Sequence, residues 1–156
     1  RTITRLPPRH SNILQNVRIL FYNDSADSNP VAAAAAVRSF KDPLVVVSGG
    51  RDAGFDYGPL ATAVARSLAV RGVILIGENR PKIEQSFGEH GVRVPVTPAA
   101  TLQSAVRAAW QQARKLITGG APAVVILFAP ASKSFDMFKN YADRGKQFDS
   151  IVRAFR

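Results

Sequence analysis

Short apolar runs alternate along this chain with segments whose apolar residues recur every three or four positions. Runs rich in β-branched residues are typical of strands buried on both faces, and they occur at residues 17–22, 44–47, 73–76 and 123–128. After the first run, Asn29-Pro30 opens an Ala-rich helix to about Ser39, because Asn is a preferred N-cap and Pro a preferred first helical residue. Alternating strands and helices predict right-handed crossovers and a largely parallel sheet.

The remaining elements follow from weaker patterns. Leu60, Val64 and Leu68 recur at intervals of four and predict one amphipathic helix over 59–70. Further helices are expected near 81–87, over 102–116 before a glycine pair, and from the Ser-rich turn towards Arg156, with a short edge strand at 92–96 and an edge hairpin from the lead-in. The expected fold is an α/β, doubly wound, mostly parallel sheet with helices on both faces, and residues 1–156 form a single domain.

Composition limits the classes of function. The 156 residues are 46% hydrophobic and 21% charged, which fits one globular domain. The absence of cysteine excludes disulfides and thiolate catalysis and is compatible with a cytoplasmic location. His10 and His90 lack ligand spacing, so no metal site is expected. No apolar stretch is long enough to span a membrane, and the start at Arg1 suggests a domain cut from a larger polypeptide.

The net charge of +10 raises the possibility of nucleic-acid binding. The basic residues are scattered, however, and no interleaved aromatic and basic motif or helix-turn-helix signature is present. A solvated basic surface is the preferred interpretation, with no nucleic-acid partner. Such a surface also attracts anionic substrates.

Polar loops follow three of the predicted strands, at residues 24–29, 49–56 and 129–141. In parallel α/β sheets, ligands bind beyond the carboxyl ends of the strands. Ser132 and Ser134 could therefore hold a carboxylate or phosphate beside the start of the next helix. Alternatively, Ser134 and Asp136 simply cap that helix. Neither a Gly-x-Gly-x-x-Gly dinucleotide loop nor a Gly-x-Ser-x-Gly hydrolase elbow is present.

The same loops resemble a known family. The run SFDMFKNYADRGKQF at 134–148 resembles the closing motif of the Mur ligases, in particular those that add D-glutamate. Residues 21–30 resemble the family's Asn-Asp-Ser-Lys-Ala-Thr-Asn motif, 48–57 its Gly-Gly-x-Asp-Lys-Gly-x-Asp loop, and 6–9 its opening Leu-Pro-His-Arg. Each motif is short, but the four occur in order over nearly the whole chain.

The resemblance implies an ATP-dependent ligase of peptidoglycan precursor synthesis in the cytoplasm. Such ligases phosphorylate the carboxylate of a UDP-N-acetylmuramoyl acceptor, and an amino acid amine then attacks the acyl phosphate. This chain has no Gly-x-x-x-x-Gly-Lys-Ser/Thr phosphate loop. It therefore resembles the C-terminal domain, which binds the amino acid and closes over ATP. ATP and Mg²⁺ would be held mainly by a central domain outside the chain, and this domain alone is expected to be inactive.

Site residues carry over by motif position. Ser28 and Ser134, with backbone groups at Phe135 and Tyr141, would bind a carboxylate of glutamate. The acceptor would be UDP-N-acetylmuramoyl-L-alanine, and the other partners the remaining domains of the ligase. Arg9, Asp24 and Asn29 would face ATP, with Asp24 near the ribose hydroxyls.

Two departures from the family pattern matter for specificity. Ala26 and Ala53 stand where the family has lysines. Our hypothesis is that Arg51, Lys133 or both replace the missing cations. Two alternatives stay open: a ligase domain for another amino acid, such as L-glutamate, and a non-catalytic module that binds nucleotides or precursors.

Overall fold

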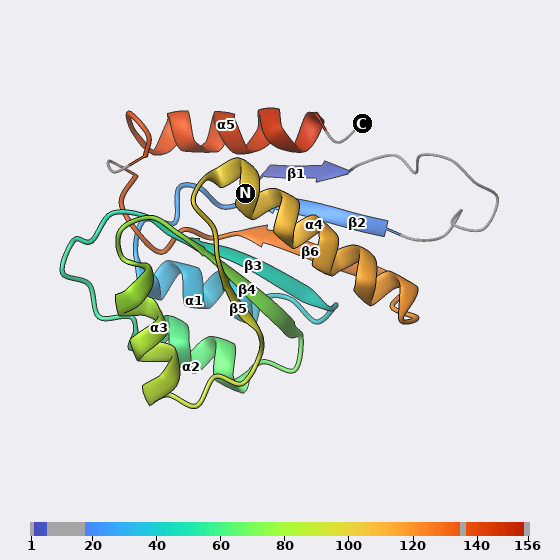
Figure 1. Cartoon of the computed structure of the whole chain (residues 1–156), viewed down its shortest axis with the longest axis horizontal. Helices are drawn as coiled ribbons and strands as arrows, with labels where there is room; N and C mark the ends of the chain where they lie inside the picture. Colours follow the sequence, from blue (N-terminus) through green and yellow to red (C-terminus); the bar gives the residue numbers. More distant parts are fainter. Residues whose placement is uncertain (1, 6–17, 135–136, 155–156) are drawn as a thin grey trace.

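A six-stranded sheet crosses the molecule in the order β1-β2-β6-β3-β4-β5 (Figure 1). The computed structural model describes residues 2–5, 18–134 and 137–154. The strands are β1 (Thr2–Arg5), β2 (Arg18–Asn23), β3 (Leu44–Gly49), β4 (Val70–Ile76), β5 (Val96–Pro98) and β6 (Ala123–Phe128). All neighbouring pairs are parallel except β1 with β2. The mostly parallel sheet and its antiparallel edge were both predicted.

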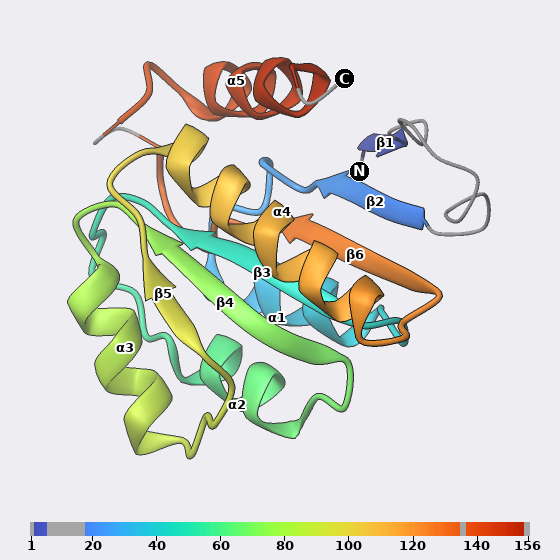
Figure 2. The ribbon, with the colours of Figure 1, turned by 45° about the vertical axis from the view of Figure 1, so that its right-hand side comes forward.

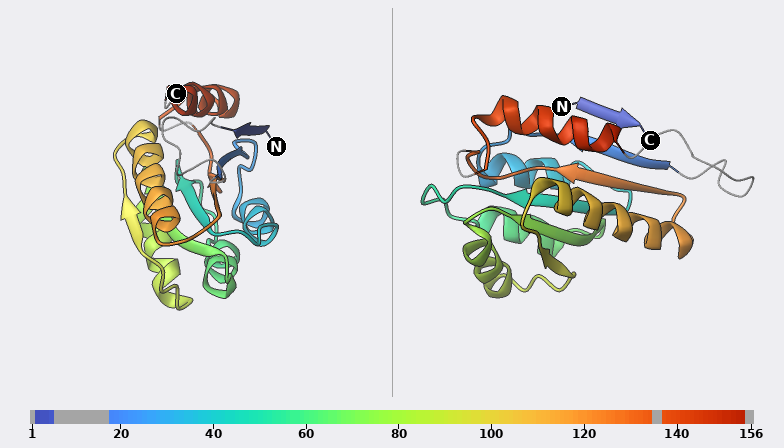
Figure 3. Two further views of the ribbon diagram at one scale, coloured as in Figure 1. Left: turned by 90° about the vertical axis from the view of Figure 1, so that its right-hand side faces the viewer. Right: turned by 45° about the horizontal axis from the view of Figure 1, so that its top comes forward.

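Helices cover both faces of the sheet, as predicted for a doubly wound fold (Figures 2 and 3). One layer contains α1 (Pro30–Arg38), α2 (Gly58–Arg66) and α3 (Arg80–Glu89), and the other contains α4 (Leu102–Thr118) and α5 (Tyr141–Arg153). Each layer forms its own apolar core with the sheet. No described helix is long and apolar enough to cross a bilayer.

The central strands β3 and β6 explain why these two cores form. In β3, Val46 packs into the core under α1 and α2, whereas Val45 and Val47 pack into the core under α4. Successive side chains of a strand point to opposite faces, so a continuous apolar run supplies buried side chains to the cores on both faces of the sheet. All three valines are fully buried, and each contributes roughly 1.5–3 kcal/mol to folding. The loops after these strands therefore start from a rigid platform.

Aromatic rings attach α4 and α5 to the sheet. Trp110 stacks on Phe21 with ring centroids 6.0 Å apart, which supports core packing rather than a ligand platform. Phe148 is fully buried and stacks on Phe128 at 4.7 Å. This contact holds α5 against the end of β6.

The predicted boundary of α2 was wrong. The helix ends at Arg66, and Leu68, which was predicted to lie on its apolar stripe, is 91% exposed. The hydroxyl of Ser67 accepts hydrogen bonds from the main-chain N–H groups of Ala69 and Val70. Because a serine side chain can replace helical bonds in this way, the chain turns here and enters β4 three residues earlier than predicted.

The strand predicted at 92–96 is also displaced, since β5 comprises Val96–Pro98. Pro95 lies just before the strand, and its carbonyl accepts a hydrogen bond from Val73 N–H of β4. Regular pairing with β4 begins at the next residue, Val96. β5 does lie at the edge of the sheet, where proline is tolerated.

Candidate functional site

Three loops that carry the motifs lie side by side at the carboxyl ends of the parallel strands. We call residues 24–29, 50–56 and 129–134 the motif loops; they follow β2, β3 and β6, which are adjacent in the order β2-β6-β3. Main-chain hydrogen bonds join them, from Ala131 N–H to Asp27 C=O at 3.1 Å and from Arg51 N–H to Lys133 C=O at 2.8 Å. The predicted convergence on one face is therefore confirmed.

Glycine permits the close approach of these loops. A Cβ at Gly50 would lie 2.6 Å from the Lys133 carbonyl oxygen, and one at Gly77 would lie 2.4 Å from the Gly50 carbonyl oxygen. Gly77 also has φ +83°, a conformation that glycine adopts without strain. The loops after β3, β4 and β6 can therefore pack backbone against backbone.

Arg51 and Lys133 are paired across two motif loops. They form an antiparallel bridge in which Arg51 N–H donates to Lys133 C=O at 2.8 Å. Both residues are exposed, and neither side chain makes an ion pair with another described residue. The structure thus brings together the two cations that the sequence singled out as replacements for the missing lysines.

The carboxylate of Asp52, the residue after Arg51, is hydrogen-bonded to groups other than the paired cations. It accepts from Gly54 N–H and from Lys82 Nζ, each at 3.0 Å. The hydrogen bond from Gly54 N–H, followed by the one from Lys82, lowers the pKa of Asp52 below its ordinary value of 3.8. Asp52 is therefore ionised at neutral pH and contacts Lys82 rather than Arg51.

The serines predicted to bind a carboxylate lie in adjacent loops. Ser134 is 3% exposed, and Ser28 is half-buried with its hydroxyl donating to Ala26 C=O at 3.2 Å. Tyr141, whose backbone was predicted to complete the pocket, is the first residue of α5 and has a largely exposed side chain. Phe135, predicted beside them, lies outside the described residues.

The simpler interpretation of Ser134 as a helix cap was wrong. Asn140 caps α5, with its side-chain oxygen accepting from Asp143 N–H at 2.8 Å. The Ser134 carbonyl instead accepts from Phe138 N–H at 3.0 Å. Because α5 begins at Tyr141, its free N–H groups do not lie immediately after the serines, and the expected helix-start anion site is not formed there. Asp136 lies outside the described residues.

The residues predicted to face ATP belong to the loop after β2. Asp24 is 7% exposed, and its main-chain N–H extends the β2–β6 ladder by donating to Phe128 C=O at 2.9 Å. The side-chain oxygen of Asn29 caps α1 by accepting from Ala32 N–H at 2.9 Å. Arg9 lies outside the described residues. The ATP contacts themselves stay predictions.

Sequence reasoning missed a buried polar network beneath the motif loops. Asn79, 1% exposed, donates from Nδ2 to the hydroxyls of Tyr57 and Ser132, each at 2.6 Å. Its Oδ1 accepts from Gly50 N–H at 2.9 Å. The available signal was only the position of Asn79 after the carboxyl end of β4, because its partners come from distant loops.

Arg144 supports the same loops from α5. Its fully buried guanidinium donates from Nη1 to Ser132 C=O and from Nη2 to Ser25 C=O, both at 2.7 Å, and lies 6.0 Å from the centre of the Phe128 ring. Hydrogen bonds from a charged group are strong when buried. Arg144 lies within the closing motif, so the resemblance could have identified it.

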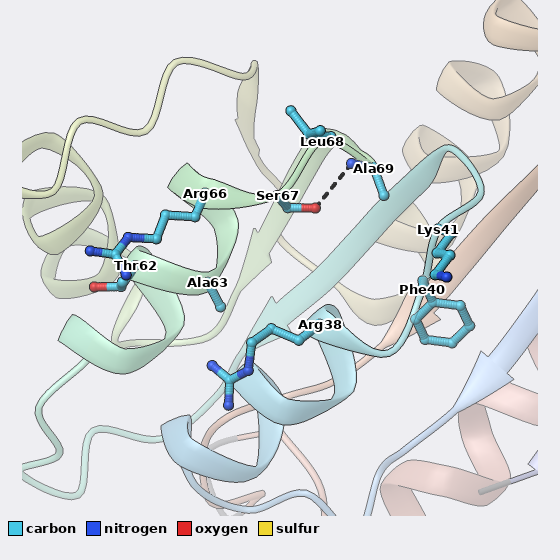
Figure 4. A pocket seen from close by; sticks show the side chains of 9 residues that line it. All are labelled: Arg38, Phe40, Lys41, Thr62, Ala63, Arg66, Ser67, Leu68 and Ala69. Carbon is cyan, nitrogen blue, oxygen red and sulfur yellow. Dashed lines mark hydrogen bonds between the residues drawn. The ribbon is translucent and has the colours of Figure 1, made fainter.

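Two hollows lined by described residues do not coincide with the paired cations. One, of about 540 Å³, lies at the amino ends of β3 and β4 (Figure 4), and its lining residues are Arg38, Phe40, Lys41, Thr62, Ala63, Arg66, Ser67, Leu68 and Ala69. The other, of about 500 Å³, lies between the start of α4 and α5. Ligands of parallel sheets bind at the carboxyl ends, so the first hollow is not the candidate site. Among the described residues no three His, Cys, Asp or Glu side chains gather to hold a metal ion.

Comparisons with known proteins identify relatives over most of the chain. The UDP-N-acetylmuramoylalanine–D-glutamate ligases of Symbiobacterium thermophilum, Chlorobaculum tepidum and Bdellovibrio bacteriovorus are 36%, 41% and 34% identical to it over 90%, 84% and 99% of its length. The chain spans only 30%, 26% and 31% of these proteins.

No protein-family profile matches the chain. Among solved structures, UDP-N-acetylmuramate–alanine ligase MurC from Thermotoga maritima matches 95% of this chain and 29% of that protein, at 11% identity and a TM-score of 0.44.

Proposed function

Because this chain belongs to the Mur ligase family, we propose that it is the C-terminal domain that binds the incoming amino acid in an ATP-dependent amide-forming ligase. The amino acid is D-glutamate, and the acceptor is UDP-N-acetylmuramoyl-L-alanine, a peptidoglycan precursor in the cytoplasm. One observation carries the proposal: the three motif loops adjoin at the carboxyl ends of β2, β6 and β3. ATP and Mg²⁺ are bound mainly by other domains, with Asp24 and Asn29 approaching ATP from this side.

The proposed role of this domain is to bind the amino acid and to orient its amine. The hydroxyl of Ser134 would donate to a carboxylate of glutamate, and so would that of Ser28 once it turns away from the Ala26 carbonyl. Ordered loops hold the amine in one direction relative to the activated acceptor, and such orientation supplies much of the acceleration of a bimolecular step. The buried contacts of Asn79 and Arg144 keep these loops ordered.

The paired cations are proposed to bind the other carboxylate of glutamate. Arg51 and Lys133 would replace the lysines that the family has at Ala26 and Ala53. Their main chains are joined directly, both are exposed, and Asp52 is paired with Lys82 instead. A dicarboxylic amino acid provides the second negative charge that this pair requires.

A second candidate function follows from the same two alanines. With the cations displaced from their usual positions, the motif loops could select another amino acid, such as L-glutamate. The catalytic class would be unchanged, and only the amino acid bound by the motif loops would differ. A module that binds nucleotides or precursors without catalysis is the remaining alternative.

The test uses the complete polypeptide that contains this chain. Phosphate release is measured with ATP, Mg²⁺ and UDP-N-acetylmuramoyl-L-alanine, and with D-glutamate, L-glutamate or a neutral amino acid of similar size. Release that depends on D-glutamate supports the proposal. Preference for L-glutamate or a neutral amino acid supports the second candidate, whereas no release with any amino acid contradicts the ligase function and leaves the binding module.

A further inference from the structure

Asn79 stands at the start of a helix but does not cap it. It occupies the N-cap position of α3, and its side chain makes no hydrogen bond to that helix. Asparagine is a preferred N-cap because its side-chain oxygen normally accepts from the first turn. Here the side chain turns away from α3, so helix capping does not account for its position.

The side chain instead joins two motif loops and the start of α2. Gly50 N–H can only donate, so the atom facing it must be the carboxamide oxygen, and the Nδ2 group then faces the hydroxyls of Tyr57 and Ser132. Tyr57 and Ser132 are themselves 3.2 Å apart. All three side chains are at most 2% exposed, so water does not compete for these hydrogen bonds.

Ser132 belongs to a motif loop, so its hydrogen bond to Asn79 also restrains the residues beside it in that loop. Its neighbour Ala131 has φ +58°, an uncommon conformation for a residue other than glycine that persists only where surrounding contacts enforce it. On the other side, Lys133 C=O accepts from Arg51 N–H. A side chain that fixes Ser132 therefore also fixes the segment that presents Lys133 and Ser134.

We infer that Asn79 is a positioning residue of the amino acid site, which sets the placement of Lys133 through Ser132 and of Arg51 through Gly50 without contacting the substrate. This inference deepens the proposed function and rests on it for the identity of the ligand. It also assigns a role to the loop after β4, which carries none of the residues identified by resemblance.

The first experiment measures amide hydrogen exchange in this chain without ligand, for Asn79→Ala and Asn79→Ser. Serine caps helices as well as asparagine does but is too short to reach Ser132. We expect exchange of the Arg51 and Ala131 amides to accelerate about 10-fold in both variants, as local opening becomes easier. The Val125 amide in β6 should be unaffected. Restored protection in Asn79→Ser would overturn the inference, because a capping role alone would then explain Asn79.

The second experiment measures steady-state kinetics of the complete ligase. Asn79→Ala and Ser132→Ala should each raise the KM for glutamate roughly 5-fold. The double variant should raise it by less than the product of the two single effects, because the bond between Asn79 and Ser132 is already lost in either single variant. The KM for ATP should change less than about twofold, because the lost hydrogen bonds hold the segments that carry Lys133 and Arg51, which are proposed to bind the amino acid.

Val64→Ala, in the buried face of α2, is the control for a general loss of stability. If it raises the KM for glutamate as much as Asn79→Ala does, the inference is wrong. If the unchanged ligase shows no dependence on any amino acid, the proposed function fails. In that case the exchange experiment still decides whether Asn79 positions the loops.

Discussion

Arg51 and Lys133 lie directly opposite each other in an antiparallel bridge, joined by a main-chain hydrogen bond of 2.8 Å. Side chains at opposed positions leave the same face of the strands and lie close together, and like charges there repel. Two exposed cations held in this way favour an anion between them. This relationship is the physical basis for placing a carboxylate of glutamate at the motif loops.

Ser134→Ala should weaken binding of the amino acid. The hydroxyl belongs to a residue that is 3% exposed, and loss of a hydrogen bond to a charged carboxylate should raise the KM for glutamate roughly 10-fold or more. Steady-state kinetics of the complete ligase measure this effect. Ser86→Ala, at a buried serine of α3, is the matched control. Equal KM values for Ser134→Ala and the unchanged enzyme would remove Ser134 from the site.

Gly50→Ala should destabilise the domain, whereas Gly88→Ala should not. The new Cβ at Gly50 would lie 2.6 Å from the Lys133 carbonyl oxygen, and relief of such overlap costs about 1–3 kcal/mol. At Gly88, inside α3, nothing lies within 4 Å, and alanine should stabilise the helix by roughly 0.5–1 kcal/mol. Urea unfolding of both variants measures the difference. A smaller effect at Gly50 than at Gly88 would contradict the close packing of the loops.

The contribution of Asp52 to stability should depend on pH. Its pKa is lowered in the folded state by bonds from Gly54 and Lys82. A group with a lowered folded pKa stabilises the protein above its unfolded pKa, and this contribution is lost as pH falls through the folded pKa. Asp52→Asn should therefore lower the melting temperature at pH 7, and this difference should shrink as the pH falls below the ordinary pKa of 3.8. A constant difference between pH 7 and pH 2.5 would show that ionisation of Asp52 is irrelevant.

Leu60 and Leu68 were predicted on one helical stripe but occupy opposite environments. Leu60 is fully buried and Leu68 is 91% exposed. Leu60→Ala should reduce the free energy of unfolding by about 2–5 kcal/mol, and Leu68→Ala should change it by less than about 0.5 kcal/mol. Denaturant unfolding tests both. Comparable losses for the two variants would mean that α2 continues through Leu68.

The fold could be predicted largely because its strongest signals are local. The apolar run of β6 and the Asn29-Pro30 start of α1 depend only on neighbouring residues, and both elements begin where predicted. The end of α2 could not be placed, because Ser67 turns the chain within a run of regularly spaced apolar residues. The start of α5 could not be placed, because Ser134 and Asp136 are as plausible as helix caps as Asn140.

The candidate site was predictable only in part. Strand alternation was enough to bring three loops to one edge, so the proximity of Arg51 and Lys133 followed from the topology. Their direct pairing did not, because it depends on the close approach allowed at Gly50. Asn79 was not predictable, since its three partners come from parts of the chain far from one another in sequence.

The most direct test of the account is the KM for D-glutamate of the complete ligase carrying Arg51→Ala and Lys133→Ala together. Each substitution removes a cation that would form a charge-assisted bond with the carboxylate, although exposure to solvent reduces the strength of each bond. We therefore expect the KM for D-glutamate to rise about 10-fold or more while the KM for ATP stays the same. Lys41→Ala, an exposed cation at the opposite edge of the sheet, should leave both KM values unchanged. An unchanged KM for D-glutamate in the double variant, or an equal rise in Lys41→Ala, would contradict the claim that this pair binds the amino acid.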